Sequence, residues 1–239
     1  MACFRPRKLR RFRLQLLKGP AALVFSRQLY FTGIESSGIV ILAASLIGFG
    51  FVYAIENSLD AVSGIRALEF LALLSAKSLG VLITGFVFVA RSITAISSEL
   101  ALMSVTGELK TLERLGIDSN RYLLIPRVLA STVAASILSV YFLVASLLAA
   151  NLAQGGRLDL LSIERIVSSL QPAVVFSGFI RAGIFAGASV LWIQRYAIRR
   201  RSSFTEVPIG ASQAVLHSIV LILVLEAIYQ LFTFVPFPI

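Results

Sequence analysis

The sequence contains one cysteine and one histidine, and these shortages exclude several classes of protein. Two such residues cannot supply the ligands of a zinc site, and Cys3 lacks the preceding apolar segment that a lipoprotein signal needs. The chain contains no glycine-rich loop ending in Lys-Ser or Lys-Thr, and no serine lies in a nucleophile-elbow pattern. We therefore expect no catalytic residue, no bound metal and no cofactor in this chain, and we interpret His217 as a packed or interfacial side chain.

Charged residues are also scarce. They make up 14% of the chain and hydrophobic residues 57%, whereas soluble domains average about a quarter and about half. A net charge of +10 would suit a nucleic-acid-binding protein, but the basic residues lie between apolar segments, where membrane topology explains them better. The composition predicts a protein that resides in lipid.

Five apolar segments are each close to the ~20 residues that an α-helix needs to cross a bilayer. They lack the alternation of a membrane β-barrel, so we predict an all-α membrane protein with a transmembrane domain over residues 36–239. The predicted spans are Gly38–Ile55, Leu68–Val89, Val128–Ala150, Pro172–Ile193 and Gln213–Val235.

The lysines and arginines between these spans are unevenly distributed. If the N-terminus is cytoplasmic, 17 of them lie on the cytoplasmic side and three, Arg66, Arg157 and Arg165, lie on the other side. Cytoplasmic loops of membrane proteins are enriched in basic residues. The sequence therefore predicts a cytoplasmic N-terminus and, after five spans, a C-terminus on the outer side.

Residues 1–35 are basic and precede the first span. Apolar side chains continue through residues 20–34 up to that span, which predicts a helix lying in the membrane interface. Residues 4–17 place Leu9, Phe12 and Leu16 at helical spacing among arginines. For this stretch a second interfacial helix and a disordered basic tail attracted to anionic lipid both remain open.

The loop between the second and third spans carries an amphipathic helix pattern over residues 99–115. Its apolar side chains recur at three- and four-residue steps, and its polar side chains fall mostly on the opposite side. Gly116 is a plausible stop for this helix. The pattern predicts a surface helix that docks on a soluble partner, and the alternative is a helix that lies on the membrane surface.

Three charged residues lie inside predicted spans, where a charge is costly and often functional. At 1.5 Å per residue, Lys77 and Arg181 are each ~14 Å from the outer end of their helices, and Glu226 lies at a similar level. Two cations and one carboxylate would suit a lipid phosphate. In the alternative interpretation Glu226 compensates one cation and the other extends to water.

Small residues in two spans predict close helix contacts, either within the chain or across a dimer. They are Ala44, Gly48 and Gly50 in the first span and Gly178, Gly183 and Gly187 in the fourth.

The stretch from Ala90 to Ala130 resembles the MlaE/YrbE family of ABC-transporter permeases, and RQLYFTGIESSGIVI near the N-terminus is similar to that family's entry into its first span. Gly107 and Glu108 stand where the family usually has Glu-Gln, and Lys77-Ser78 stands where it has Arg-Glu. The matching residues are Gln28, Tyr30, Gly33, Arg91, Glu99, Met103, Val105, Thr106, Leu112, Glu113, Gly116, Asp118, Tyr122, Pro126 and Arg127.

The resemblance implies a permease subunit of the bacterial inner membrane that pairs with itself or a sister permease. It implies a cytoplasmic ATPase that uses ATP and Mg, an MCE-domain partner on the outer face, and transport of phospholipid or a related lipid. In the family, basic residues occupy the positions that correspond to Lys77 and Arg181, and an acidic residue often occupies the position that corresponds to Glu226. The implied coupling helix to the ATPase contains Glu99, Leu102, Met103, Val105, Thr106, Leu109, Leu112 and Glu113.

Two other functions stay open. A secondary transporter could use the same three intramembrane charges to couple to an ion gradient, although five spans do not divide into paired inverted halves. A membrane scaffold without transport activity would also use a cytoplasmic helix and a basic tail, but it would have less reason to contain buried charge.

Overall fold

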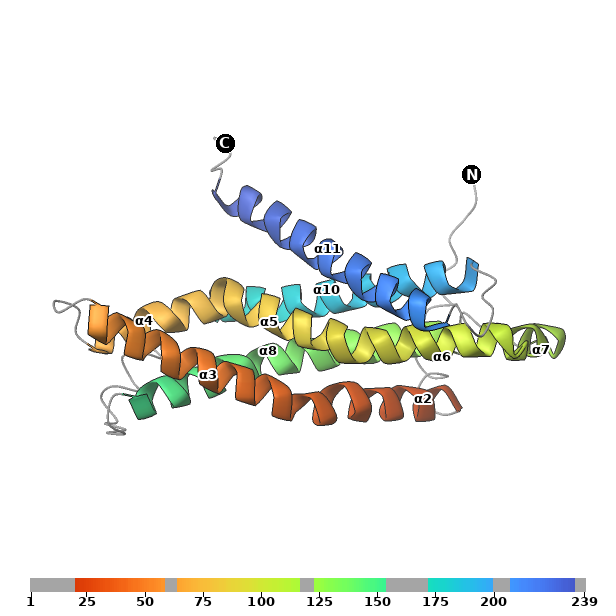
Figure 1. The fold of residues 1–239 in the computed structure, drawn as a ribbon, viewed down its shortest axis with the longest axis horizontal. Helices are drawn as coiled ribbons and strands as arrows, with labels where there is room; N and C mark the ends of the chain where they lie inside the picture. Colours follow the sequence, from red (N-terminus) through yellow and green to blue (C-terminus); the bar gives the residue numbers. More distant parts are fainter. Residues whose placement is uncertain (1–19, 59–63, 117–122, 154–171, 200–206, 235–239) are drawn as a thin grey trace, which may run out of the picture.

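The computed structural model of the protein is a bundle of long helices that run roughly along one axis (Figure 1). It describes residues 20–58, 64–116, 123–153, 172–199 and 207–234. Within these ranges no strand occurs, and five helical segments are long and apolar enough to cross a membrane. The prediction of an all-α, multi-pass membrane protein is confirmed.

The first span begins earlier than the sequence indicated. Its apolar helical run covers Phe25–Ile55. The run lies within three consecutive elements, which are helix α2 (Pro20–Leu29), the π-helical turn η1 (Tyr30–Ile34) and helix α3 (Glu35–Ser58). The N-terminal helix predicted over residues 20–34 is present, but it is joined directly to the span. Its position in the membrane interface stays a prediction, and residues 4–17 lie outside the described part of the chain.

The second span extends well past the predicted end at Val89, so that the apolar helical run covers Ala67–Val105. Arg91 does not end the helix, because it forms an ion pair with Glu35 and lies 5.3 Å from the ring centroid of Phe31. The run contains two π-helical turns. Its elements are α4 (Gly64–Leu74), η2 (Ser75–Leu79), α5 (Gly80–Phe88), η3 (Val89–Ile93) and α6 (Thr94–Val105).

The remaining spans are α8 (Ile125–Ala153), α10 (Pro172–Arg199) and α11 (Val207–Phe234). Helix α8 lies at the centre, packed against α3 on one side and α10 on the other. Helix α11 crosses the bundle obliquely, and its C-terminal end projects away from the other helices (Figure 1). Accordingly, 17% of the most apolar stretch of α11 is buried, compared with 56% for α8.

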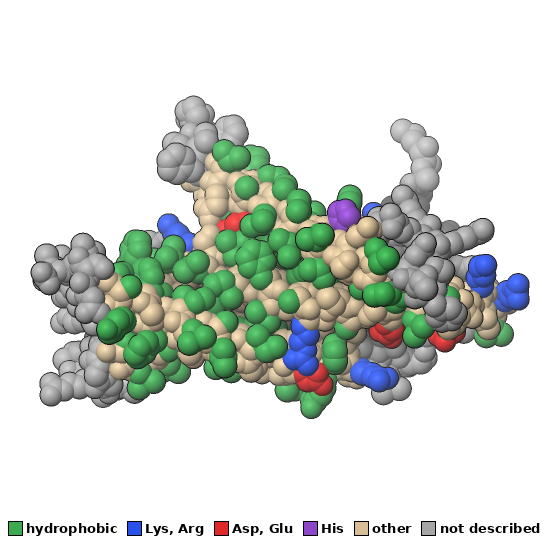
Figure 2. Space-filling view, viewed as in Figure 1, with side chains coloured by type: hydrophobic (Ala, Val, Ile, Leu, Met, Phe, Trp, Pro, Cys, Tyr) green, Lys and Arg blue, Asp and Glu red, His purple; other side chains and the backbone are tan. Residues whose placement is uncertain are grey.

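Hydrophobic side chains cover most of the visible face of the bundle, and most of the charged side chains on that face lie toward the end that carries α7 (Glu108–Arg114) (Figure 2). Large apolar residues such as Leu42, Leu46 and Phe176 are more than half exposed. Such a surface would be unfavourable in water and suits contact with acyl chains.

Glycines let α8 approach its neighbours closely, as the small-residue pattern predicted. A Cβ on Gly48 would overlap the carbonyl of Ser146, and a Cβ on Gly183 or Gly187 would lie 2.5–2.6 Å from a hydroxyl of α8. These contacts lie within one chain. Gly50, predicted with the same group, has open space beside it.

Replacing Gly48 with Ala should therefore destabilise the bundle, because α3 and α8 must separate to accommodate the methyl group. Overpacking of this kind costs about 1–3 kcal/mol. We expect a lower midpoint of thermal unfolding in detergent and lower membrane abundance. Gly50→Ala on the same helix is the matched control and should behave like the native chain; equal behaviour of the two variants would contradict the close approach.

Candidate functional site

A buried ion pair joins the last two spans. Nη1 of Arg181 on α10 lies 3.4 Å from both carboxylate oxygens of Glu226 on α11. The two side chains are 7% and 6% exposed. Because a charge inside a membrane span is costly when it is unpaired, each residue depends on the other.

Two further side chains complete the surroundings of the carboxylate. The hydroxyl of Ser78 in η2 donates to Oε1 of Glu226 at 2.6 Å. The amide of Gln230, one turn along α11, donates to the same oxygen at 2.9 Å and to the hydroxyl oxygen of Ser78 at 2.8 Å. Ser78 thus connects the second span to the fifth through a charge-assisted hydrogen bond.

The guanidinium of Arg181 is held on its other sides as well. Nη2 donates to the backbone carbonyl of Lys77, and Nε donates to the carbonyl of Ser177 at 3.3 Å. The ring centroid of Tyr229 lies 3.9 Å from the guanidinium carbon, a cation–π contact. The carbonyl of Lys77 lies within the π turn η2, a kind of helix interruption that is frequent at functional sites.

The three predicted charges therefore converge, but not in the same way. Arg181 and Glu226 are in direct contact, whereas Lys77 joins them through its backbone and its side chain is exposed. The geometry agrees with the alternative of a charge-compensated pair with a second cation directed outward. A role for Lys77, Arg181 and Glu226 in binding a headgroup stays a prediction.

Sequence reasoning did not identify Ser78, Tyr229 and Gln230 as members of this cluster. The signal available was local: Ser78 is next to Lys77, and Gln230 lies four residues after Glu226, which places these two side chains on one face of α11. Polar residues at such positions in a membrane span are expected to pair with the charge beside them.

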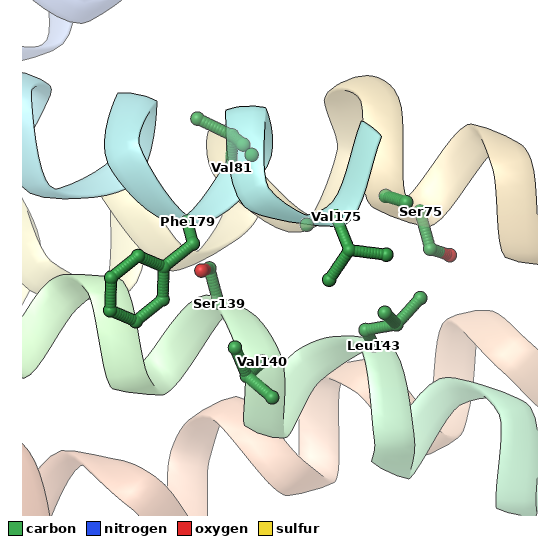
Figure 3. A pocket seen from close by; sticks show the side chains of 10 residues that line it. Ser75, Val81, Ser139, Val140, Leu143, Val175 and Phe179 are labelled. Atoms are coloured by element: carbon green, nitrogen blue, oxygen red, sulfur yellow. The ribbon is translucent and has the colours of Figure 1, made fainter. Parts of the chain in front are cut away.

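A small cavity lies between η2, α5, α8 and α10. Ser75 and Ser139 line it together with apolar side chains that include Leu143, Val175 and Phe179 (Figure 3). Its volume is about 10 Å³, enough for roughly one water molecule. This cavity is too small to hold a lipid.

The predicted coupling helix is divided in two by the structure. Helix α6 ends at Val105, Gly107 adopts a φ of +79°, and α7 begins at Glu108 as a separate helix. A left-handed φ favours glycine and interrupts the helical ladder, so the single helix over residues 99–115 is corrected to α6, a break and α7.

The predicted docking residues are distributed over both helices. Glu99 forms an ion pair with Arg127 at 2.7 Å, and the hydroxyl of Thr106 donates to the carbonyl of Leu102 at 3.0 Å. Leu102 is exposed, and Glu113 lies in α7. The remaining apolar side chains are partly buried: Met103, Val105, Leu109 and Leu112.

Comparison with protein families assigns this chain to a family. The family model described as Permease MlaE matches residues 25–232, a range that includes the first four spans, nearly all of the fifth, the ion pair and α7. The chain belongs to the MlaE permease family. This confirms the resemblance seen near the N-terminus and in residues 90–130, and the match covers most of the chain.

Several relatives are similar to this member of the MlaE family. The intermembrane phospholipid transport system permease protein MlaE of Haemophilus influenzae is 28% identical over 179 residues, which cover 70% of this chain and 66% of that protein. A probable ABC transporter permease protein of Rickettsia conorii is 29% identical over 172 residues, or 66% and 63% of the two chains. Protein TRIGALACTOSYLDIACYLGLYCEROL 1, chloroplastic, of Arabidopsis thaliana is 26% identical over 213 residues, or 87% and 61%. The chain thus spans somewhat less than two thirds of each relative.

The ion pair leads to a test of its contribution to the stability of the fold. Glu226→Gln leaves a buried guanidinium without its counter-charge, and breaking a buried pair typically costs about 3–5 kcal/mol. We expect the variant to accumulate poorly in the membrane. Replacing both partners, as Arg181→Met with Glu226→Leu, should restore abundance, measured by quantitative blotting of membranes.

Lys77→Ala is the control, because the pair contacts the backbone of this residue and its side chain is exposed. Its abundance should equal that of the native chain. Normal accumulation of Glu226→Gln would show that the pair does not support the fold.

Proposed function

We propose that this chain is the membrane subunit of an ABC transporter that moves phospholipid or a related lipid between the bacterial inner membrane and an MCE-domain partner. A separate cytoplasmic ATPase, with ATP and Mg, drives it, and an MCE-domain protein on the outer face exchanges lipid with it. The family match and the names of the Haemophilus and Rickettsia relatives support this function. The excess of basic residues supports a cytoplasmic N-terminus and an α7 that faces the ATPase.

The observation that carries the proposal is the continuity of the second span. Helix α6, which leads to the loop helix α7, belongs to the same helical run as Ser78. Ser78, in the other half of that run, donates a hydrogen bond to Glu226 of α11. A displacement of α7 that moves the end of α6 therefore reaches the charge cluster along one helical run.

Within this function α7 and the end of α6 are the docking surface. Amphipathic helices bind partners by laying an apolar ridge in a groove, and the partly buried Leu109 and Leu112 supply such a ridge. The positive φ of Gly107 separates α7 from α6, so the ridge belongs to a short helix of its own at the end of the span.

Lys77 and Gln230 form the exposed margin of the charge cluster, and we place the lipid phosphate there. The ammonium supplies positive charge and the amide supplies hydrogen-bond donors, while Arg181 and Glu226 hold η2 and α11 in position. The small volume of the cavity inside the bundle favours a lipid path on its outside. A second permease subunit facing the cluster would enclose that path, which is why we propose a dimer.

Co-purification tests the function as a whole. The subunit should co-elute with an ATPase whose turnover depends on it, and the reconstituted complex should transfer fluorescent phospholipid only with hydrolysable ATP. Uptake driven by an ion gradient in vesicles that contain this chain alone would assign it to secondary transport instead.

Leu109→Asp should remove the ATPase from the purified complex while the permease stays in the membrane. The change deletes an apolar contact of about 1.5–3 kcal/mol and adds the cost of desolvating a carboxylate. Thr111→Asp, on the exposed side of α7, introduces the same charge and should retain the ATPase. Equal recovery of ATPase with both variants would reject α7 as the docking helix.

Lys77→Ala should lower the rate of lipid transfer several-fold at unchanged membrane abundance, because the side chain is exposed and its loss removes a charge from the site of the phosphate. Lys77→Arg keeps the charge and should transfer lipid at close to the native rate. The measurement is ATP-dependent transfer per molecule of complex. Unchanged transfer by Lys77→Ala would remove the lysine from the lipid path.

A further inference from the structure

A second, larger cavity lies at the other end of the second span. Its volume is about 530 Å³, within the range of sites that bind small molecules. The N-terminal helix and η1 form one wall with Arg27, Tyr30 and Phe31, and α6 with the start of α8 forms the other with Ile96, Glu99 and Arg127. Glu99 lies 21 residues after Ser78 on the same helical run, so roughly 30 Å separates this cavity from the charge cluster.

Arg127 is the buried cation of this cavity. Its side chain is 4% exposed, and Nη2 forms the ion pair with Glu99, whose own side chain is 55% exposed. Nε and Nη1 are buried and have no hydrogen-bond partner among the described residues. Buried donors without acceptors are costly, so this guanidinium has capacity for an additional anionic group.

The remaining charges of the lining favour an anion as well. Glu35 is neutralised by Arg91, and Glu99 is neutralised by Arg127. Arg27 is exposed and makes no ion pair within the described part of the chain. The lining and its partners therefore contain one cation more than they contain carboxylates.

We propose that this cavity binds the phosphate headgroup of an anionic glycerophospholipid from the leaflet on the α7 side of the membrane. Arg27 and Arg127 supply the charge for the phosphate, and Gln28 and Tyr30 supply polar groups beside it. Phe31, Ile96 and Leu123 form an apolar wall for the glycerol and upper acyl chains.

Two observations favour a membrane lipid over a soluble phosphate. The cavity lies between helices of the first, second and third spans, and Tyr30 at its edge is 56% exposed, as expected of an aromatic residue at a membrane interface. A phosphate bound between Arg27 and Arg127 would connect the N-terminal helix to the ion pair that joins α6 and α8. This site is distinct from the proposed transport path and does not depend on the direction of transport.

The test uses the full chain purified in detergent with equal amounts of phosphatidylglycerol and phosphatidylcholine, and native mass spectrometry measures which lipid stays bound. We expect preferential retention of phosphatidylglycerol. Arg27→Gln should reduce that preference about two- to fivefold, the effect of losing one partly solvated charge. Ala95→Phe, which fills the cavity and keeps its charges, should reduce it as well.

The matched control is Arg195→Gln, since Arg195 is an exposed arginine of α10 that does not line the cavity. This variant should retain phosphatidylglycerol like the native chain. Equal retention by the native chain, Arg27→Gln and Ala95→Phe would overturn the proposal.

Two competitors distinguish other occupants. Inorganic phosphate in millimolar excess should leave the bound phosphatidylglycerol in place; displacement would assign the cavity to a soluble phosphate and overturn a lipid site. Phosphatidylglycerol should also remain bound when the ATPase is added. Its release in the complex would assign Arg127 to an acidic side chain of the partner and would likewise overturn the lipid site.

Discussion

The arrangement of the bundle at the end opposite α7 depends on one buried ion pair. A guanidinium or a carboxylate alone inside a membrane span would be strongly unfavourable, so Arg181 and Glu226 must be in contact whenever α10 and α11 are folded. Their contact also determines where the second span lies, because Ser78 and the carbonyl of Lys77 occupy the remaining hydrogen-bonding positions. Helix α11, of whose most apolar stretch 17% is buried, is thereby joined to the bundle by polar groups in addition to apolar side chains such as Ile222.

Hydropathy and the rise of the α-helix were sufficient to predict the five spans and the common depth of Arg181 and Glu226. They could not predict on which face of the helix the side chain of Lys77 lies. A π turn contains an additional residue and rotates the side chains that come after it, so the periodicity of a regular α-helix does not give the face on which a side chain of η2 lies. Depth along a membrane helix depends on counting residues, whereas the facing direction depends on local backbone geometry that hydropathy does not encode.

The end of the second span and the break in the loop helix also depend on local geometry and distant contacts that the sequence pattern does not show. An unpaired charge at Arg91 would end the span near Val89, yet the partner of this arginine, Glu35, is 56 residues away in the sequence. The amphipathic pattern of residues 99–115 does not reveal the positive φ of Gly107, which divides the helix. The cavity beside Arg127 was not predicted, since it forms only where segments from the first, second and third spans meet.

The pairing of Arg181 with Glu226 has an electrical consequence. The membrane potential does work of about 2.3 kcal/mol per 100 mV on each elementary charge that crosses the full field. Two opposite charges in contact that move together with α10 and α11 carry no net charge through that field. The pair therefore adds no voltage dependence to a rearrangement of these helices, and it can change position in an energised membrane without electrical work.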